Sequence, residues 1–456
     1  MRVQSTGLRL SLAAAAVVAV ALVSSACGGS GGQASPSPSP ANGSPVSGTA
    51  TATPQPPLEP ANYRFLYSEF GADADIIWSI KPDDPTDRVQ VASVPHKTGW
   101  AITPALSPDG KKIAYTVMPD EALSSNTDAE AYILDIKSGK PNLVAKGVDL
   151  LTVPRWSPDG ALLFLRRNAG EDVTVILLDL VKRVKQGTPV PTPDPEEKEP
   201  PPARTVLREH VSDVLSYIPL GFDAKSATMY FVQIRGGTES GSYLGRYGPA
   251  SGEAVATATA IADATATVTA GTPPPVVTPA PSPSPVLPGD VFLVLSDQIA
   301  RDYALSPDAT RVAFLVPGLV EGQFVSRTYI ADVKSEDVSA LPSPAGLAPG
   351  DQLSPAWHPD GKSVAIGQIP AGSEPGRVAV VPLDGAKPLF LPPPDKGFDQ
   401  PLSWSPDGKF LAVTSFSGES LGNPGSARLV FVSVNGQRPA APEGTEIRPV
   451  GWLAAE

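Results

Sequence analysis

Apolar residues along the chain recur in short runs of strand length, and each run follows the same tight turn. The run after Asp109 reads KKIAYTV and the run after Asp407 reads KFLAVTS, with apolar side chains on both alternating faces. That pattern is typical of a strand buried on both sides. The turn before it reads Ser-Pro-Asp-Gly, in which Pro presets one turn position and Gly accepts a left-handed one. Each copy therefore predicts a β-hairpin.

The turn repeats along most of the chain. Its copies, aligned on their aspartates, stand at Asp109, Asp159, Asp223, Asp308, Asp360 and Asp407. The copy at Asp223 is degenerate because it has lost Pro and Gly. The intervals are 50, 64, 85, 52 and 47 residues, and the two long ones contain Pro-, Thr- and Ala-rich segments near 184–203 and 254–288. Without these insertions the two long intervals shorten to about 45 to 50 residues, close to the other three and to the period of a four-stranded propeller blade.

The strands within one period also follow a fixed order. After the hairpin a third strand ends at a turn, as in AYILDIKSGK, and a weaker fourth strand such as NLVAKGV leads to the next copy. Residues 63–94 contain three strands of a blade whose first strand is missing, and the C-terminal IRPVGWLAAE supplies it. The sequence therefore predicts an all-β, seven-bladed β-propeller of four-stranded antiparallel blades, closed by the N- and C-terminal strands. Six blades are the alternative.

The repeat of Ser-Pro-Asp-Gly followed by an apolar strand resembles the TolB-like β-propeller repeat, over roughly residues 61–456. That repeat is found in periplasmic TolB and in the propellers of prolyl oligopeptidase-type enzymes. The resemblance implies the propeller fold, but propellers support unrelated functions. No segment resembles the N-terminal α/β domain of TolB.

The N-terminus predicts export and anchoring. Arg2 and Arg9 precede the apolar segment SLAAAAVVAVALV, and residues 1–26 read as a signal peptide. The small residues before Cys27 resemble a bacterial lipobox, in which the cysteine is lipidated. Cys27 is the only cysteine in the chain. Residues 27–60 then have the composition of an unfolded Pro/Ser/Gly/Thr linker. We expect an extracytoplasmic propeller, attached to the bacterial cell membrane by a lipid at Cys27.

The charge of the chain argues against nucleic acid as a partner. It has 35 Lys and Arg against 47 Asp and Glu, a formal net charge of −12, and no basic run is present. Nucleic-acid-binding proteins instead carry concentrated positive charge.

Candidate catalytic and metal-binding motifs all have simpler structural explanations. GESLG at 418–422 has the letters of a nucleophile elbow, but Ser420 lies in a loop between two predicted strands and no His follows it. His358 replaces the serine of its turn, whereas His96 and His210 fall near fourth strands, where we expect solvent exposure. The six repeat aspartates occur once per blade, so a structural role in the turn is expected rather than a shared calcium ion. We predict no catalytic, cofactor or metal residues.

Three classes of function remain open. The first is a non-enzymatic scaffold that binds an envelope protein or a polymer through one propeller face. The second is an enzyme, either a degenerate prolyl-oligopeptidase-type hydrolase or a polysaccharide lyase, and the third is a small-molecule sensor. For the scaffold we expect contacts from the connections Pro119–Ala129 and Ser417–Ser426, between second and third strands. Both long insertions join third to fourth strands, so they should emerge on the opposite face.

Overall fold

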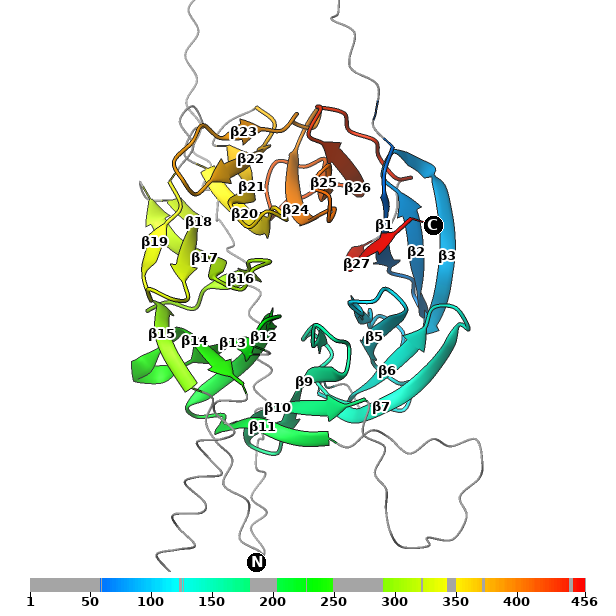
Figure 1. Ribbon diagram of the computed structural model, residues 1–456, viewed down its shortest axis with the longest axis vertical. Coiled ribbons are helices and arrows are strands. Elements are labelled where there is room, and N and C mark those ends of the chain that lie inside the picture. The colour runs from blue at the N-terminus through cyan, green and yellow to red at the C-terminus, as the bar shows by residue number, and fades with distance from the viewer. Residues whose placement is uncertain are drawn as a thin grey trace, which may run out of the picture. The chain divides into compact units, whose positions relative to one another are not determined.

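The described part of the protein forms a ring of seven antiparallel sheets (Figure 1). The computed structural model describes residues 58, 60–122, 125, 127–180, 203–226, 228–248, 290–320, 323–342, 350–370, 374–442 and 446–455. The predicted seven-bladed propeller is confirmed, and the six-bladed alternative is wrong. The predicted signal peptide, Cys27 and almost all of the linker and the two insertions lie outside the described residues.

The first four blades each contain four strands, named here from the centre of the ring to its rim (Figure 1). Blade 1 contains β27 (Ile447–Ala454), β1 (Tyr63–Glu69), β2 (Ala74–Lys81) and β3 (Asp84–Pro95). Blade 2 contains β4 (Thr103–Leu106), β5 (Lys112–Val117), β6 (Ala129–Asp135) and β7 (Lys140–Val148). Blade 3 contains β8 (Arg155–Trp156), β9 (Leu162–Ala169), β10 (Asp172–Asp179) and β11 (Ala203–His210). Blade 4 contains β12 (Val214–Asp223), β13 (Thr228–Arg235), β14 (Gly241–Tyr247) and β15 (Asp290–Ser296), with a 3-10 turn, η1 (Gly237–Glu239), between β13 and β14.

The remaining blades end in short rim strands or in none. Blade 5 contains β16 (Arg301–Leu305), β17 (Arg311–Val320), β18 (Gln323–Asp332) and β19 (Val338–Ala340). Blade 6 contains β20 (Gly350–Trp357), β21 (Ser363–Pro370), β22 (Arg377–Pro382) and β23 (Leu389–Phe390). Blade 7 contains β24 (Phe398–Trp404), β25 (Phe410–Phe416) and β26 (Ala427–Ser433).

The fourth position of blade 7 is filled by irregular chain rather than by a full strand. Phe431 N donates to Pro439 O at 2.8 Å, and Ala441 N donates to Leu429 O at 2.9 Å. Proline has no backbone N–H to donate to a ladder. Pro439 and Pro442 therefore explain why this segment follows β26 without forming a regular strand.

The hydrophobic core lies between the blades. The second strands β5 and β25 are buried along almost their whole length, on both faces of their sheets. Seven clusters of buried apolar residues result, each made by two neighbouring blades, and one of them joins blade 7 to blade 1. The predicted burial of these strands on both sides is confirmed.

The repeated turn is held by a side-chain hydrogen-bond pattern. In the first copy Ser107 Oγ donates to Asp109 Oδ1 at 2.7 Å, which also accepts from Lys111 N at 3.1 Å. Ser107 Oγ in turn accepts from Lys112 N at 2.9 Å. Gly110 completes the turn with a φ of 70°, in the left-handed region that glycine adopts without strain. The same Ser-to-Asp bond recurs at Asp159, Asp308 and Asp407.

The ring closes by pairing the two ends of the folded chain. β27 runs antiparallel to β1, with Tyr63 opposite Ala454 and Glu69 opposite Ile447. Figure 1 shows the red C-terminal strand beside the blue N-terminal strand at the inner side of blade 1. The predicted closure by both termini is confirmed.

Tryptophans on the innermost strands connect blades 3, 6 and 1 to the blade that precedes each of them in the ring. Trp156 Nε1 donates to Ala105 O at 3.1 Å, and Trp357 Nε1 donates to Ala304 O at 2.9 Å. Trp452 Nε1 reaches Ser403 Oγ at 2.9 Å, across the closure of the ring. Trp404 occupies the same repeat position, but its Nε1 has no hydrogen-bond partner among the described residues. Its ring instead meets the edge of the His358 ring at 4.9 Å.

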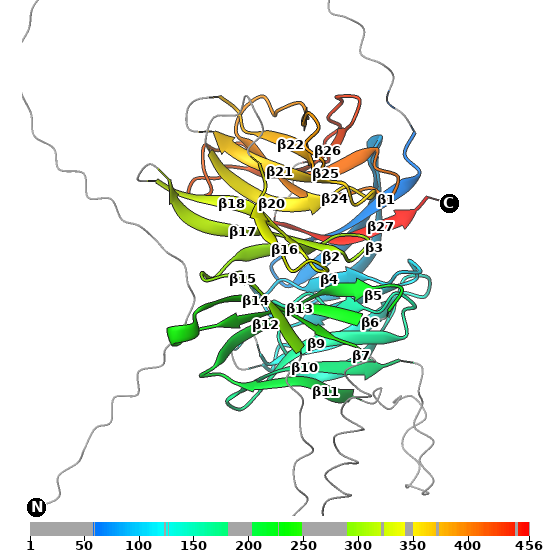
Figure 2. The same cartoon turned by 60° about the vertical axis from the view of Figure 1, so that its left-hand side comes forward.

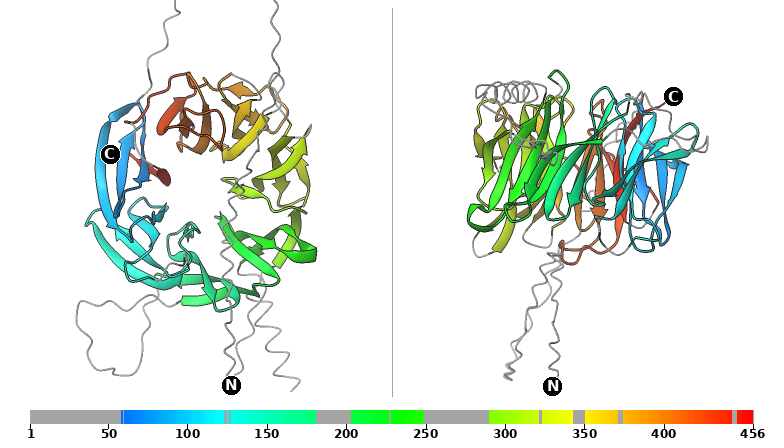
Figure 3. Two further views of the ribbon diagram at one scale, coloured as in Figure 1. Left: turned by 180° about the vertical axis from the view of Figure 1, so that it is seen from behind. Right: turned by 90° about the horizontal axis from the view of Figure 1, so that it is seen from below.

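The antiparallel order gives the ring two chemically different faces. The face that we call the loop face carries the connections between second and third strands and those from each fourth strand to the next blade. The opposite turn face carries the Ser-Pro-Asp-Gly turns and the connections between third and fourth strands. Figures 2 and 3 show the ring obliquely and edge-on, with the two faces on opposite sides of the disc.

The tryptophan bonds predict a difference between two matched variants. Trp156→Phe removes a buried hydrogen bond to the preceding blade, whereas Trp404→Phe removes a similar volume and no such bond. We expect Trp156→Phe to lower the free energy of unfolding by about 1 kcal/mol more than Trp404→Phe does. Urea unfolding of both variants measures the difference, and equal losses would contradict this role of the indole N–H.

The turn aspartates predict an acid-dependent contribution to stability. Hydrogen bonds from Ser157 and from Ala161 N hold the pKa of Asp159 below its ordinary value of 3.8. Because the folded pKa is the lower one, the stabilisation is complete above the unfolded pKa and is lost as pH falls through the folded pKa. At pH 7 we expect Asp159→Ala to cost up to about 1 kcal/mol, since the exposed carboxylate is screened by solvent.

Urea unfolding of the wild-type protein and of Asp159→Ala, repeated from pH 7 to pH 2.5, tests this expectation. The two unfolding free energies should converge only below the ordinary aspartate pKa of 3.8. A difference that does not change with pH would show that the carboxylate charge has no part in the turn.

Candidate functional site

The loop face contains a cleft between blades 3 and 4. Its volume is about 430 Å³. It lies where the end of β11, the connection from β11 to β12, the end of β13 and η1 come together. The lining residues are Glu209, Ser212, Asp213, Val214, Gln233, Arg235, Gly236, Gly237, Thr238 and Glu239. A cleft of this size is within the range of about 300–1,000 Å³ in which proteins hold small ligands or single side chains.

The one cation that lines the cleft, Arg235, is engaged by its own blade. Its Nε donates to Gln233 Oε1 at 2.7 Å and its guanidinium donates to Glu239 Oε2 at 2.9 Å. The guanidinium also lies 4.6 Å from the centre of the Tyr243 ring. Gln233 is buried and donates to Tyr217 OH at 3.2 Å below the cleft. These contacts fix the orientation of Arg235 and balance its charge.

Two carboxylates on the other wall leave the cleft acidic. Glu209 is half-buried, and among the described residues it accepts no hydrogen bond and forms no ion pair. Burial raises the pKa of Glu209, nearby Arg235 opposes the rise and Asp213 adds to it. Arg235 is also paired to Glu239 and acts on Glu209 only from nearby, so the lining residues Glu209, Asp213 and Glu239 outnumber this one cation and the cleft keeps a net negative charge.

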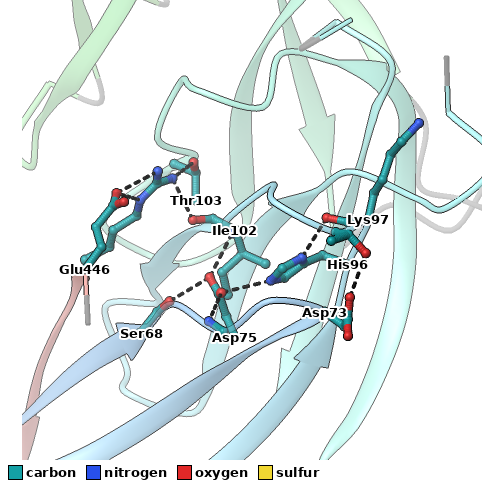
Figure 4. A network of polar contacts seen from close by, with 11 residues as sticks. Ser68, Asp73, Asp75, His96, Lys97, Ile102, Thr103 and Glu446 are labelled. Atoms are coloured by element: carbon teal, nitrogen blue, oxygen red, sulfur yellow. Dashed lines mark hydrogen bonds and ion pairs between the residues drawn. The ribbon is translucent and has the colours of Figure 1, made fainter. Parts of the chain in front are cut away.

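A second polar site on the loop face lies in blade 1 and contains His96. Figure 4 shows Asp75 at its centre, at the start of β2. Asp75 Oδ1 lies 2.9 Å from His96 Nε2, and Asp75 Oδ2 accepts from Ile102 N at 2.9 Å and from Ser68 Oγ at 3.1 Å. His96 is only 5% exposed, so the expectation that it faces solvent is wrong. The reason is that the connection after β3 folds over Asp75 and buries the ring.

His96 faces oxygen atoms through both of its ring nitrogens. Its Nδ1 lies 2.9 Å from the carbonyl oxygen of Lys97, while Nε2 faces the Asp75 carboxylate. Phe70 stacks on the ring at 5.9 Å. The network joins the connection between β1 and β2 to the connection between β3 and β4, which identifies it as a structural clamp.

A third polar group links the innermost strands of blades 5, 6 and 7. Ser354 Oγ donates to Asp302 Oδ2 at 2.8 Å and accepts from Gln400 Nε2 at 2.9 Å. Arg301 donates to Asp302 at 2.8 Å. Each of the three strands is bulged near these residues, between 301 and 304, 353 and 356, and 401 and 403. Bulges re-aim side chains, here toward the neighbouring inner strand.

The other residues singled out from the sequence lie apart from one another. Ser420 lies between β25 and β26, where its Oγ accepts from Asn423 N at 3.2 Å, and a strand rather than a helix follows it. His210 is exposed and lies 3.2 Å from Glu171. His358 is in its turn, with Nδ1 3.0 Å from Asp360. The connection Ser417–Ser426 lies on the loop face, and Pro119–Ala129 does so where it is described.

The remaining repeat aspartates also lie in turns. Asp223 accepts from Lys225 N at 2.9 Å and from Ser226 Oγ at 2.6 Å. Asp360 accepts from Lys362 N at 2.8 Å. Within the described ranges no three His, Cys, Asp or Glu side chains are grouped as a metal site would require. No helix among those residues is long and apolar enough to cross a membrane.

Neither the cleft nor the clamp has a direct signal in the sequence. Glu209 and Arg235 are on different blades, and Asp75 and His96 are separated by two strands. The segment Arg-Gly-Gly-Thr-Glu after the apolar strand at 228–235 does indicate an open polar connection. Only the ring brings that connection against the end of β11.

The clamp predicts that removing a buried carboxylate–histidine contact lowers the free energy of unfolding much more than removing an exposed one. Asp75→Ala leaves the buried His96 ring and the N–H of Ile102 without their acceptor, so we expect a loss of at least about 3 kcal/mol in the free energy of unfolding. The control is Glu171→Ala, which breaks the exposed contact to His210 and should cost less than about 1 kcal/mol. Urea unfolding measures both, and similar losses would refute the clamp.

Comparisons with known proteins show similarity of fold only. No family model matches the chain, and no curated protein matches its sequence. Among solved structures, TolB from Acinetobacter baumannii is 16% identical, with 74% of this chain and 64% of that chain covered and a TM-score of 0.42. A prolyl endopeptidase is 14% identical, with 86% and 50% covered and a TM-score of 0.50. An oligogalacturonate lyase in complex with manganese is 12% identical, with 84% and 85% covered and a TM-score of 0.48.

The chain spans less than two thirds of the length of the TolB protein and half of the prolyl endopeptidase. Identities this low carry the fold and no activity. The chain is a seven-bladed β-propeller.

Proposed function

We propose that the protein is an extracytoplasmic, lipid-anchored binding scaffold without enzymatic activity, and that its loop face holds a partner protein. The anchor is the lipid at Cys27 that the N-terminal sequence predicts. The observation that carries the proposal is the uneven distribution of exposed apolar side chains over the ring.

Most large apolar side chains that are exposed gather on one face. Of the eleven such residues in the described ranges, seven lie in loop-face connections or at the strand ends that meet them. They are Leu151, Val211, Leu215, Ile299, Leu319, Phe324 and Leu421. Three others are on rim strands, and only Val434 is on the turn face. Contiguous exposed apolar side chains typically mark a protein interface, and among these residues Leu319 and Phe324 are direct neighbours across one strand pair.

The two most exposed of these residues, Leu319 and Phe324, lie near the end of one hairpin, and we call this pair the hairpin tip. Strands β17 and β18 pair over ten residues each, and Leu319 stands directly opposite Phe324 near the end of the ladder. Leu319 is 65% exposed and Phe324 is 85% exposed. Aromatic side chains are enriched at the energetically important centres of interfaces. This hairpin tip is therefore the strongest candidate for a partner contact.

The turn face is where the low-complexity segments attach. β1, the first strand of the ring in sequence, begins on that face. The segment 181–202 joins β10 to β11 and the segment 249–289 joins β14 to β15, both third-to-fourth strand connections of the turn face. The loop face has no connection of that length, which favours it as the face that meets a partner.

In-cell photo-cross-linking tests the proposal. A photoreactive phenylalanine analogue in place of Phe324 should capture a discrete envelope protein, identified by mass spectrometry, because this side chain would be buried in the contact. The variant Leu319→Ser with Phe324→Ser should lose at least about 90% of the co-purifying partner, as expected for a central apolar anchor. The same analogue in place of Val89, on the rim strand β3, serves as the control.

Equal capture from positions 324 and 89, or no capture from position 324, would contradict the proposed scaffold function. The enzyme and sensor alternatives would then be favoured. The anchor is tested in the same cells with a labelled fatty acid, which should enter the wild-type protein and not the Cys27→Ser variant.

A further inference from the structure

Two consecutive glycines line one side of the cleft between blades 3 and 4. Gly236 and Gly237 form one side of it, and a Cβ atom at position 236 would lie 3.2 Å from Leu215 Cδ1. Gly237 has a φ of 69°, which other residues adopt only with strain. Because a Cβ atom at position 236 would lie so close to Leu215, any larger residue there would push the Leu215 side chain away from this edge. Because Gly236 and Gly237 have no side chains, this side of the cleft stays open.

An apolar side chain stands beside the acidic lining residues of the cleft. Leu215, which is 44% exposed, packs next to the lining residue Gly236, and the lining residue Val214 precedes it in the chain. Glu209 and Asp213 are lining residues of the same cleft. Long basic side chains have a matching division, an apolar stem that packs on apolar atoms and a charged end that needs a carboxylate.

The charges favour a cation over an anion. Arg235 already donates to Gln233 and Glu239, whereas Glu209 has no ion-pair partner among the described residues. An arriving carboxylate would meet Glu209 and Asp213 as like charges. An arriving ammonium or guanidinium would supply the hydrogen bonds that the half-buried Glu209 carboxylate does not receive from any described residue.

We propose that this cleft binds a lysine or arginine side chain of the partner protein. The inference rests on the proposed scaffold function and gives its interface one specific charged contact. The apolar hairpin tip of β17 and β18 would supply burial, and the cleft would supply selectivity for a partner with a basic residue at the matching position.

Small probes test the cleft without knowledge of the partner. Saturation-transfer difference NMR on the full-length protein would use the Nα-acetyl amides of arginine, lysine, norleucine and glutamate. We expect the arginine and lysine probes to bind. The norleucine probe, which has the stem without the charge, and the glutamate probe should bind much more weakly or not at all.

Variants assign the binding to Glu209. We expect Glu209→Gln to weaken the dissociation constant of the arginine probe about tenfold, as loss of one charge-assisted contact does. Asp213→Asn should weaken it less, and Glu419→Gln, on the loop face of blade 7, should leave it unchanged. Because the pKa of Glu209 is raised, the affinity should fall with decreasing pH already above the ordinary glutamate value of 4.5.

Three results would overturn the inference: binding of the norleucine or glutamate probe at the strength of the arginine probe, no binding of either basic probe, or an unchanged affinity in Glu209→Gln. Photo-cross-linking from position 324 separates this inference from the function beneath it. If capture persists while the basic probes fail to bind, the cleft assignment is wrong and the scaffold stands.

Discussion

The ring depends on one constraint, which is that the middle strands of each sheet are apolar on both faces. β5 and β25 show it most clearly, since nearly all of their residues are buried. A sheet of this kind needs a neighbour on each side, and a closed ring is the arrangement that leaves no sheet without one. The final strand β27 therefore pairs with β1, and the seventh apolar cluster forms between blades 7 and 1.

Closure of the ring also separates its two faces by role. The strand order places the start of β1 and the attachment points of both low-complexity segments on the turn face. The loop face carries the clamp around Asp75, the exposed hairpin tip and the acidic cleft. The repeated turns and the proposed partner-binding surface thus lie on different connections of the same blades, so the loop face can vary without disturbing those turns.

The sequence predicted what depends on neighbouring residues and missed what depends on the ring. The turns at Asp109 and Asp407 were predictable because Ser, Pro, Asp and Gly act within a few residues of one another. The burial of His96 was not, since its carboxylate partner comes from an earlier strand. The missing regular fourth strand of blade 7 follows from Pro439 and Pro442, a local signal that the repeat pattern concealed. The opposition of Glu209 to Arg235 required the placement of blade 3 against blade 4.

If the loop face meets a partner in the cell, side chains on that face are shielded there, and the reactivity of single thiols measures this shielding. Cys27 is the only natural cysteine, so single cysteines at Asn423 on the loop face and at Lys362 on the turn face report on the two faces separately. Both side chains are exposed in the isolated chain. We expect the cysteine at 423 to react more slowly with a hydrophilic thiol reagent in intact cells than in purified protein. The cysteine at 362 should react at the same rate in intact cells and in purified protein. Protection of position 362 with free reaction at position 423 would contradict it.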